Sequence, residues 1–375
     1  MSPISCDIFC TVIDNLGDAG VCWRLARQLA TEHHWRVRLW IDDPTPIALL
    51  APEYADLPVE VSKWEGDFAN IHPARIVIEA FACELPPRYV EAMAALPRPP
   101  VWINLEYLSA EDWVAGCHGL PSPHPPLLKH FFFPGFVPGT GGLLREHDYA
   151  VPSAPTFGET LEISLFCYAN LQLPALLDCW RDGDQAIACH VAEGLPRRQV
   201  ETWLGKSFPP RTTMRRGNLS LDALPFLPQT EYDTLLARCL LNFVRGEDSF
   251  VRAQWAERPF VWQAYPQAEG AHLAKLDAFL NRYAKVGAGP PQADARPPVG
   301  GSEPGLRAWG AIKVGAGETA LCNFWHAWNG DGALNWQEFS AALPALAARA
   351  PGWARQISAH GDLATNLVKF CLSRL

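Results

Sequence analysis

The sequence predicts an α/β protein made of two successive Rossmann-like domains that face a central cleft, each with a parallel sheet and helices on its faces. The chain has 375 residues, more than one ordinary hydrophobic core accommodates. Strand-like apolar runs alternate with amphipathic helical segments before residue 150 and again after residue 160. A proline-bearing stretch over residues 151–158 separates the two alternations, so we divide the chain into domains 1–155 and 156–355.

The first alternation starts with an apolar strand over Ile8–Ile13 and an amphipathic helix over Gly20–His33. The helix is expected because Val21, Leu25 and Leu29 recur at helical spacing, with arginines between them. The same patterns predict three more strands and one more helix, namely strands Arg36–Ile41, Arg75–Ile78 and Val101–Leu105 and helix Pro87–Ala95.

The second alternation starts with the apolar run Leu161–Tyr168. Its further expected strands are Ala186–Ala192, one near Leu224–Leu227, and Leu240–Val244, and its expected helices are Arg197–Trp203, Tyr232–Arg238 and Val251–Trp255. A Gly- and Pro-rich stretch, Gly287–Gly305, predicts an exposed loop. Helical segments run from Trp336 to the end, and such a tail can pack back on the first domain.

Charge divides unevenly between the two halves. The first 150 residues hold 19 Asp and Glu against 10 Lys and Arg, a net charge of −9, whereas the remainder holds 21 of each. An acidic half repels nucleic acid and attracts a basic partner, and a neutral half can accept an anionic ligand. Scattered, solvated carboxylates explain the same balance equally well.

Composition and segment lengths point to a folded, cytoplasmic protein. Hydrophobic residues make up 49% and charged residues 19% of the chain, and no apolar stretch approaches the ~18 residues of a membrane span. No secretory signal pattern starts the sequence. The eleven cysteines include no C-x-x-C pair, so we expect reduced and mostly buried thiols.

Two carboxylates flank a glycine on the turn after the first strand, in the segment Asp14-Asn15-Leu16-Gly17-Asp18-Ala19-Gly20. Ligands of open parallel sheets bind beyond the carboxyl ends of the strands, and a carboxylate there can accept a proton or hold a guanidinium. The alternative is structural: Asp18 caps the helix and Asp14 holds the turn. The turn lacks the G-x-G-x-x-G order, and its acidic residues oppose a phosphate, so a neutral or cationic substrate is favoured over a dinucleotide.

A second turn, Arg245-Gly246-Glu247-Asp248-Ser249, follows the strand Leu240–Val244 and opens a helix. Arg245 offers a planar charged fork, Gly246 allows close backbone approach, and the amides at the helix start can bind an anion. This combination suits a diphosphate. The alternative is a capped helix with Arg245 paired to Glu247 or Asp248.

Aromatic residues near these turns suggest a nucleotide site. Phe226 can stack on a base while Gln229 reads its edge, although core packing explains the same residues. Tyr168 and Tyr265 leave the same two possibilities open. The sequence contains no Walker motif, H-E-x-x-H, G-x-S-x-G or metal-ligand cluster, so we expect neither a metal nor a resident cofactor.

Long, ordered stretches of the chain resemble the elongation factor P arginine rhamnosyltransferases over nearly its full length. The matching stretches are residues 7–29, 78–86 (IEAFACELP), 102–112 (WINLEYLSAED), 120–123, 141–146, 225–229 and 245–254 (RGEDSFVRAQ). The resemblance implies a GT-B fold and an inverting, metal-independent transfer of L-rhamnose. It implies dTDP-β-L-rhamnose as donor and one arginine of elongation factor P as acceptor, which activates that factor to relieve ribosome stalling. It also implies a monomer without nucleic-acid or membrane partners.

The resemblance also assigns roles to individual residues. It implies that Asp18 is the general base, that Asp14 is a second essential aspartate, and that Glu247 handles the donor during catalysis. The implied donor contacts are the diphosphate residues Arg245, Asp248 and Ser249, the thymine residues Phe226 and Gln229, the further contacts Tyr168 and Tyr265, and the turn residues Asn15 and Gly17.

Two positions depart from the family pattern, Leu16, where a bulkier aromatic is expected, and Ala19, where isoleucine is expected. Three other functions compete with this interpretation. They are a GT-B enzyme with another sugar or a small-molecule acceptor, a nucleotide-binding regulator without turnover, and, disfavoured by the missing glycine pattern, a dehydrogenase.

Overall fold

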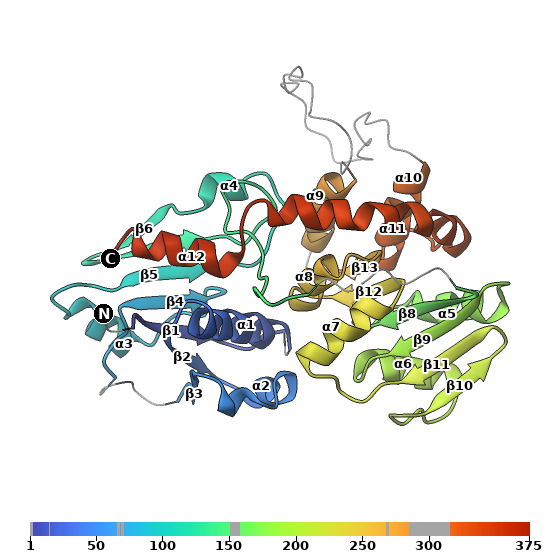
Figure 1. Cartoon of the computed structure of the whole chain (residues 1–375), viewed down its shortest axis with the longest axis horizontal. Coiled ribbons are helices and arrows are strands. Elements are labelled where there is room, and N and C mark those ends of the chain that lie inside the picture. The colour runs from blue at the N-terminus through green and yellow to red at the C-terminus, as the bar shows by residue number, and fades with distance from the viewer. Residues whose placement is uncertain are drawn as a thin grey trace, which may run out of the picture.

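Two sheets form two lobes, as Figure 1 shows for the computed structural model of the chain. The structure describes residues 3–14, 16–65, 68, 71–150, 158–267, 270–284 and 316–375. Each sheet is parallel except for one hairpin at its edge. The expected pair of Rossmann-like α/β lobes is therefore confirmed.

The first lobe contains a seven-stranded sheet in the order β3-β2-β1-β4-β5-β7-β6. Its strands are β1 Ser5–Cys10, β2 Arg36–Ile41, β3 Val59–Lys63, β4 Ile76–Ala80, β5 Val101–Leu105, β6 Pro121–His124 and β7 Leu127–Phe132. Its helices are α1 Gly17–Thr31, α2 Thr45–Leu50, α3 Pro87–Ala94 and α4 Val114–Cys117, with a 3-10 turn at Tyr54–Asp56. Helix α1 follows β1 after a short turn and packs on β2.

The second lobe contains a six-stranded sheet in the order β10-β11-β9-β8-β12-β13. Its strands are β8 Thr160–Leu165, β9 Ala186–Val191, β10 Thr213–Arg216, β11 Leu219–Ala223, β12 Leu241–Arg245 and β13 Phe260–Gln263. Its helices are α5 Leu173–Asp182, α6 Leu195–Leu204, α7 Gln229–Arg238, α8 Asp248–Trp255, α9 Ala271–Tyr283, α10 Ala316–Trp328 and α11 Trp336–Ser358.

The last helix, α12 (Leu363–Leu372), lies on the first lobe (Figure 1). Leu363, Leu367 and Cys371 are buried in the same hydrophobic cluster as strands β1 and β4. Helix α11 spans from the second lobe toward the first and carries Trp353 into the second core. The chain therefore crosses between the lobes a second time after residue 358.

The first strand ends earlier than its apolar pattern predicts, at Cys10, and α1 begins earlier, at Gly17. Side-chain carboxylates explain the end of the strand. The Asp42 Oδ1 atom accepts the Val12 amide at 2.9 Å, and Asp18 accepts the next two amides, so these groups do not extend the sheet. The apolar run Val12-Ile13 is thus part of the turn.

The strand expected near Leu224–Leu227 lies just before these residues, as β11, and Leu224–Leu227 themselves form the loop between β11 and α7. Pro225 and Pro228 lack the amide hydrogens that a ladder needs, which favours a loop there. Several further elements were not predicted, namely strands β3, β6, β7, β10 and β13 and helices α2, α4, α5, α9 and α10. The stretch Gly287–Gly305 and most of the stretch 151–158 lie outside the described residues.

All eleven cysteines are free, and most of them are buried, as expected for reduced thiols. Among the helices that the structure describes, none combines the length and the apolar character needed to cross a membrane.

Candidate active site between the lobes

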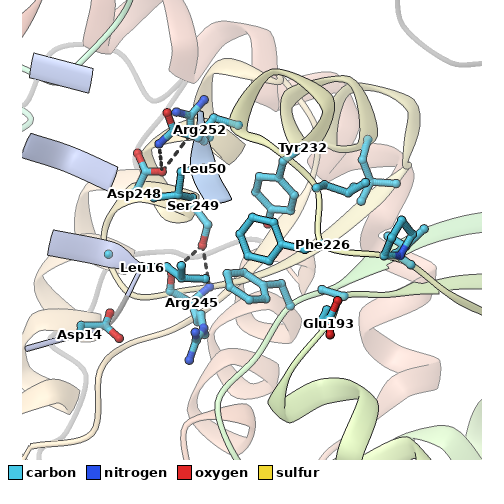
Figure 2. Close-up of a pocket in the computed structure, with 18 residues that line it drawn as sticks. Asp14, Leu16, Leu50, Glu193, Phe226, Tyr232, Arg245, Asp248, Ser249 and Arg252 are labelled. Atoms are coloured by element: carbon cyan, nitrogen blue, oxygen red, sulfur yellow. Dashed lines mark hydrogen bonds and ion pairs between the residues drawn. The ribbon is translucent and has the colours of Figure 1, made fainter. Parts of the chain in front are cut away.

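A pocket lies where the carboxyl ends of the second sheet face the first lobe (Figure 2). Figure 2 shows Asp14 and Leu16 on one side of the pocket and Phe226 on the other. The second lobe lines it with residues that follow four strands, as ligand sites of parallel sheets require. These lining residues are Phe166 after β8, Ala192 and Glu193 after β9, residues 224–227 after β11, and Arg245 at the end of β12.

The structure brings together most of the residues predicted from the sequence. Seven of them line the pocket: Asp14, Gly17, Phe226, Gln229, Arg245, Asp248 and Ser249. Four others lie beside it: Asp18 and Tyr168 are hydrogen-bonded to Asp14, Tyr265 packs against Tyr168, and Glu247 directly precedes Asp248 in the chain. Asn15 lies outside the described residues.

Several lining residues were missed in the sequence. Glu193 could have been found from the rule that strand ends carry the site, since it follows the predicted strand Ala186–Ala192, whereas Phe166 lies inside the predicted apolar run Leu161–Tyr168. Leu50, at the end of α2, had no such signal, because only the approach of the two lobes brings it to the pocket. Tyr232 and Arg252 were hidden inside predicted helices.

Asp18 is almost fully buried, at 3% exposure, and holds the first turn together. Its Oδ2 atom accepts the amide hydrogens of Ile13 and Asp14, each at 2.9 Å. The predicted alternative, a cap on the following helix, is wrong, because the residue before the helix is Leu16 and the amides that Asp18 binds precede it. Burial raises the pKa of Asp18, the two amides lower it, and the charge of Asp14 raises it again, with a net increase. The carboxylate is thus a stronger base than a solvated aspartate.

Asp14 reaches across to the second lobe. The Tyr168 hydroxyl donates a hydrogen bond to Asp14 Oδ2 at 2.6 Å. Gly246, with a φ of 60°, leaves room for this contact, because a Cβ atom there would lie 2.7 Å from Asp14 Oδ2 and 2.8 Å from the Tyr168 hydroxyl. A glycine at this point of the second turn therefore leaves room for the contact between Asp14 and Tyr168 and adopts the positive φ without strain.

Arg245 stacks on aromatic rings and does not pair with a carboxylate. Its guanidinium carbon lies 4.6 Å from the ring centre of Phe166 and 4.4 Å from that of Tyr168. Within the part of the chain that the structure describes, it forms no ion pair, so the predicted alternative of a pair with Glu247 or Asp248 is not what the structure shows. The charge is positioned by stacking and remains available to an anion.

The start of α8 is fixed next to Arg245. The Ser249 hydroxyl accepts the Arg245 amide at 3.0 Å and donates to the Arg245 carbonyl at 2.5 Å, which ties the turn closed (Figure 2). The amides at the start of a helix carry partial positive charge. The pocket therefore has two sources of positive potential, the Arg245 guanidinium and the N-terminus of α8.

Glu247 is a carboxyl that favours its neutral form. Burial raises its pKa to about 8, and the negative charge of Asp18 adds to the increase, although a hydrogen bond from the Leu108 amide at 2.9 Å lowers it. A carboxyl with this pKa is largely protonated at neutral pH and can donate a hydrogen bond.

Gln229 lines the pocket and carries a buried acceptor. Its Nε2 atom donates to Asp248 Oδ2 at 3.2 Å, and a carboxylate oxygen accepts only, so the amide is oriented with Oε1 away from Asp248. Among the described residues, nothing donates to this buried Oε1 atom. A ligand with an N–H group would satisfy it. Phe226 lines the same pocket.

Tyr265 lies at the edge of the site. Its ring meets that of Tyr168 edge-on, with centres 5.5 Å apart, and its side chain is 46% exposed. No group of three or more His, Cys, Asp or Glu side chains suited to a metal ion occurs among the residues the structure describes.

Comparisons with known proteins agree over the whole chain. The family model described as Elongation-Factor P (EF-P) rhamnosyltransferase EarP matches residues 6–296 and 308–372. Two relatives named protein-arginine rhamnosyltransferase are similar throughout: one from Pseudomonas putida is 43% identical over 97% of both chains, and one from Pseudomonas aeruginosa is 42% identical over 98% of both.

Solved structures show the same fold. The chain matches a structure described as the structural basis for EarP-mediated arginine glycosylation of translation elongation factor EF-P, with a TM-score of 0.64, 31% identity and coverage of 99% of this chain and 100% of the other. The spinosyn rhamnosyltransferase SpnG matches at a TM-score of 0.51 and 10% identity over 98% and 99% of the two chains, which supports the GT-B fold alone. With its two α/β lobes, its pocket between them and its match to the family model over nearly its full length, this chain belongs to the EF-P rhamnosyltransferase family EarP.

Proposed function

We propose that this protein transfers L-rhamnose from dTDP-β-L-rhamnose to an arginine side chain of elongation factor P, with inversion at the anomeric carbon. Family membership supports the reaction class. The observation that carries the proposal for this chain is the hydrogen bond between Tyr168 and Asp14, since it brings the carboxylate-bearing turn of one lobe to the anion-binding pocket of the other.

The second lobe suits a thymidine diphosphate. Gln229 Oε1 is a buried acceptor without a donor among the described residues, and the N3–H group of thymine is a donor of the right kind. Phe226, which lines the same pocket, offers a ring for stacking. Arg245 and the first amides of α8 would hold the diphosphate, with Ser249 fixing the turn.

The first lobe suits a cationic acceptor. A guanidinium is protonated in proteins, and its nitrogen lone pairs are delocalised, so it is a poor nucleophile. Asp14 would orient the guanidinium fork, and Asp18, with its raised pKa, would take one proton from the attacking nitrogen. Placement of the two substrates across the cleft would supply much of the rate.

The bond changes balance. The arginine nitrogen attacks the anomeric carbon from the face opposite the diphosphate, a C–N bond forms, the C–O bond to the diphosphate breaks, and dTDP leaves with the bonding electrons. A β-linked donor then yields an α-linked product. The proton goes to Asp18, and the Arg245 guanidinium stabilises the negative charge that develops on the leaving diphosphate. Glu247, largely protonated near neutral pH, can donate a hydrogen bond to the donor.

We further propose that the reaction needs no divalent metal, because Arg245 and the α8 amides supply positive charge at the diphosphate. The protein would act in the cytoplasm as a monomer, and rhamnosylated elongation factor P would relieve ribosome stalling.

Mass spectrometry of elongation factor P tests the proposal. The factor is incubated with the protein and dTDP-β-L-rhamnose, with a different nucleotide sugar in a parallel reaction and EDTA in a third. We expect one deoxyhexose on one arginine in the first and third reactions only, and an α linkage by NMR. Binding of dTDP without any transfer would indicate a regulator and overturn the proposal, and loss of transfer in EDTA would overturn metal independence.

A further inference from the structure

Arg24, on helix α1, is a buried arginine that joins the two lobes. It is 1% exposed. Its guanidinium donates three hydrogen bonds to two carboxylates, those of Glu146 and Asp248. Its Nε and Nη2 atoms donate to the two oxygens of Glu146 at 2.8 and 2.7 Å. Its Nη1 atom donates to Asp248 Oδ1, in the first turn of α8, at 2.9 Å. One side chain of the first lobe thus holds the helix that opens the donor pocket.

Asp248 connects Arg24 to residues that line the donor pocket. Its other oxygen, Oδ2, accepts from Arg252 Nε at 3.0 Å and from Gln229 Nε2 at 3.2 Å. Both carboxylate oxygens therefore face cations or an amide of the protein, which leaves Asp248 poorly suited to contact a phosphate itself. Its contact with Gln229 orients the free Oε1 acceptor of the pocket.

Close approach of α1 to the second lobe makes these contacts possible. Gly20 lies one turn before Arg24, and a Cβ atom there would lie 3.1 Å from Asp248 Oδ2 and 3.2 Å from Gln229 Nε2. The segment between the lobes is held in the same place, because Trp255 Nε1 donates to the Leu144 carbonyl at 2.7 Å.

We propose that Arg24 is a positioning residue of the transfer reaction: its fork holds α1, which carries Asp18, in register with the start of α8 and with Gln229. This inference rests on the proposed function for its kinetic consequences. Asp18 and Arg24 lie on the same helix, and Asp248, Ser249 and Gln229 surround the donor pocket. The distance from base to donor is thereby set by a contact that touches neither substrate.

The geometry requires arginine and not simply a positive charge. A guanidinium can bind both oxygens of Glu146 and still donate to Asp248, whereas an ammonium group is a point charge without a fixed fork. The ion pairs hold the pKa of Glu146 well below its usual range despite burial, which indicates a carboxylate that stays ionised. Loss of the fork would leave two buried carboxylates partly unpaired.

Arg27 provides a matched control. It lies on the same helix and also binds Glu146, with Nη2 3.0 Å from Oε1, but among the described residues it has no ion pair with Asp248. Substitution of Arg27 removes one ion pair between α1 and Glu146, which lies in the segment between the lobes. It leaves the ion pair between Arg24 and Asp248 of α8 in place.

The test compares Arg24→Lys, Arg27→Met and wild type in the transfer assay and in amide hydrogen exchange. For Arg24→Lys we expect the donor KM to rise and kcat to fall, each by about 10-fold, which corresponds to one charge-assisted hydrogen bond. Amide exchange over residues 245–255 should accelerate, while strand β9 of the same lobe keeps its protection. Arg27→Met should stay within about twofold of wild type in both kinetic constants.

A second variant keeps the test decisive if Arg24→Lys does not fold. In Gly20→Ala, the added Cβ atom of the same helix would crowd Asp248 and Gln229 without changing any charge. Alanine also favours the helix. It should give the same pattern of a raised donor KM and faster exchange at the start of α8. Wild-type kinetics in a folded variant, or an equal loss in Arg27→Met, would overturn the positioning role. If wild-type protein transfers no rhamnose, the proposed function fails, and the exchange data alone then decide whether Arg24 holds α8.

Discussion

The hydroxyl of Tyr168, just beyond strand β8, donates a hydrogen bond to Asp14, on the turn that follows the first strand of the other lobe, with 2.6 Å between the oxygens. The same tyrosine ring carries the guanidinium of Arg245 on its face. One residue therefore connects a carboxylate assigned to the acceptor with a cation assigned to the donor. This arrangement explains why neither turn alone constitutes the site.

Tyr168→Phe tests this connection. The phenylalanine ring keeps the surface on which Arg245 stacks and removes only the hydroxyl, so Asp14 loses a fixed donor. We expect kcat to fall about 10-fold, as for a hydrogen bond to a charged group, with the donor KM within about threefold of wild type. Steady-state kinetics with varied donor measure both constants, and an unchanged kcat would show that Asp14 is positioned without Tyr168.

Asp18→Asn tests the general base. Asparagine keeps an oxygen for the amides of Ile13 and Asp14, so the turn should persist, but it cannot take a proton from the acceptor. We expect transfer to fall by about 10²–10⁴, the usual contribution of a general base, while dTDP binding stays within about twofold. Single-turnover assays and calorimetric titration with dTDP measure the two effects. Retention of the wild-type rate would remove Asp18 from the role of base.

Arg245→Ala tests the diphosphate site. Loss of the stacked guanidinium should weaken dTDP binding about 10- to 100-fold, the range for charge-assisted hydrogen bonds to phosphate. Arg181→Ala is the control, because Arg181 pairs with Asp178 and Asp182 on the surface of the same lobe. Calorimetry with dTDP compares the two variants, and equal affinities would contradict the assignment.

Glu247→Gln tests the raised pKa of that carboxyl through the pH dependence of stability. The folded protein binds the Glu247 proton up to a pKa of about 8, whereas the unfolded chain releases it near 4.5. The folded state therefore carries the extra proton between these values, and its stability falls as pH rises through that window. Glutamine mimics the protonated carboxyl and removes this loss.

We therefore expect the melting temperature of wild type to fall by a few degrees more between pH 6 and pH 9 than that of Glu247→Gln. Each pH unit below the folded pKa of about 8 costs about 1.4 kcal/mol of stability, roughly 2–3 kcal/mol over this range. Thermal unfolding of both proteins across the range measures the difference. Parallel curves for the two proteins would show that Glu247 is ionised in the folded state at neutral pH.

The elements that could be predicted were those with strong periodicity or with turn chemistry in the sequence. Helix α1 was expected from its apolar spacing, and β2 and β5 were expected with the bounds they have. Strand β11 was expected too far along the chain, near the loop over residues 224–227, because the apolar pattern of that loop outweighed two prolines that cannot donate to a ladder. Edge strands such as β13 were missed, since a four-residue strand carries little pattern of its own.

The candidate site divides in the same way. Asp14, Asp18 and Arg245 could be found because each lies on a turn that follows an apolar strand, and strand ends are where α/β proteins bind ligands. Leu50 and Phe166 could not be assigned with them, because nothing local distinguishes these side chains from core residues.

The sequence by itself determined two α/β lobes, two polar turns and the chemistry available on each, because periodicity, glycines and charged residues act over a few neighbouring positions. Only the tertiary structure decided which groups meet. The Tyr168–Asp14 hydrogen bond and the Arg24–Asp248 ion pair join residues 154 and 224 positions apart. Such contacts depend on how two separately folded sheets pack, and that packing sums many weak interactions that no local pattern encodes.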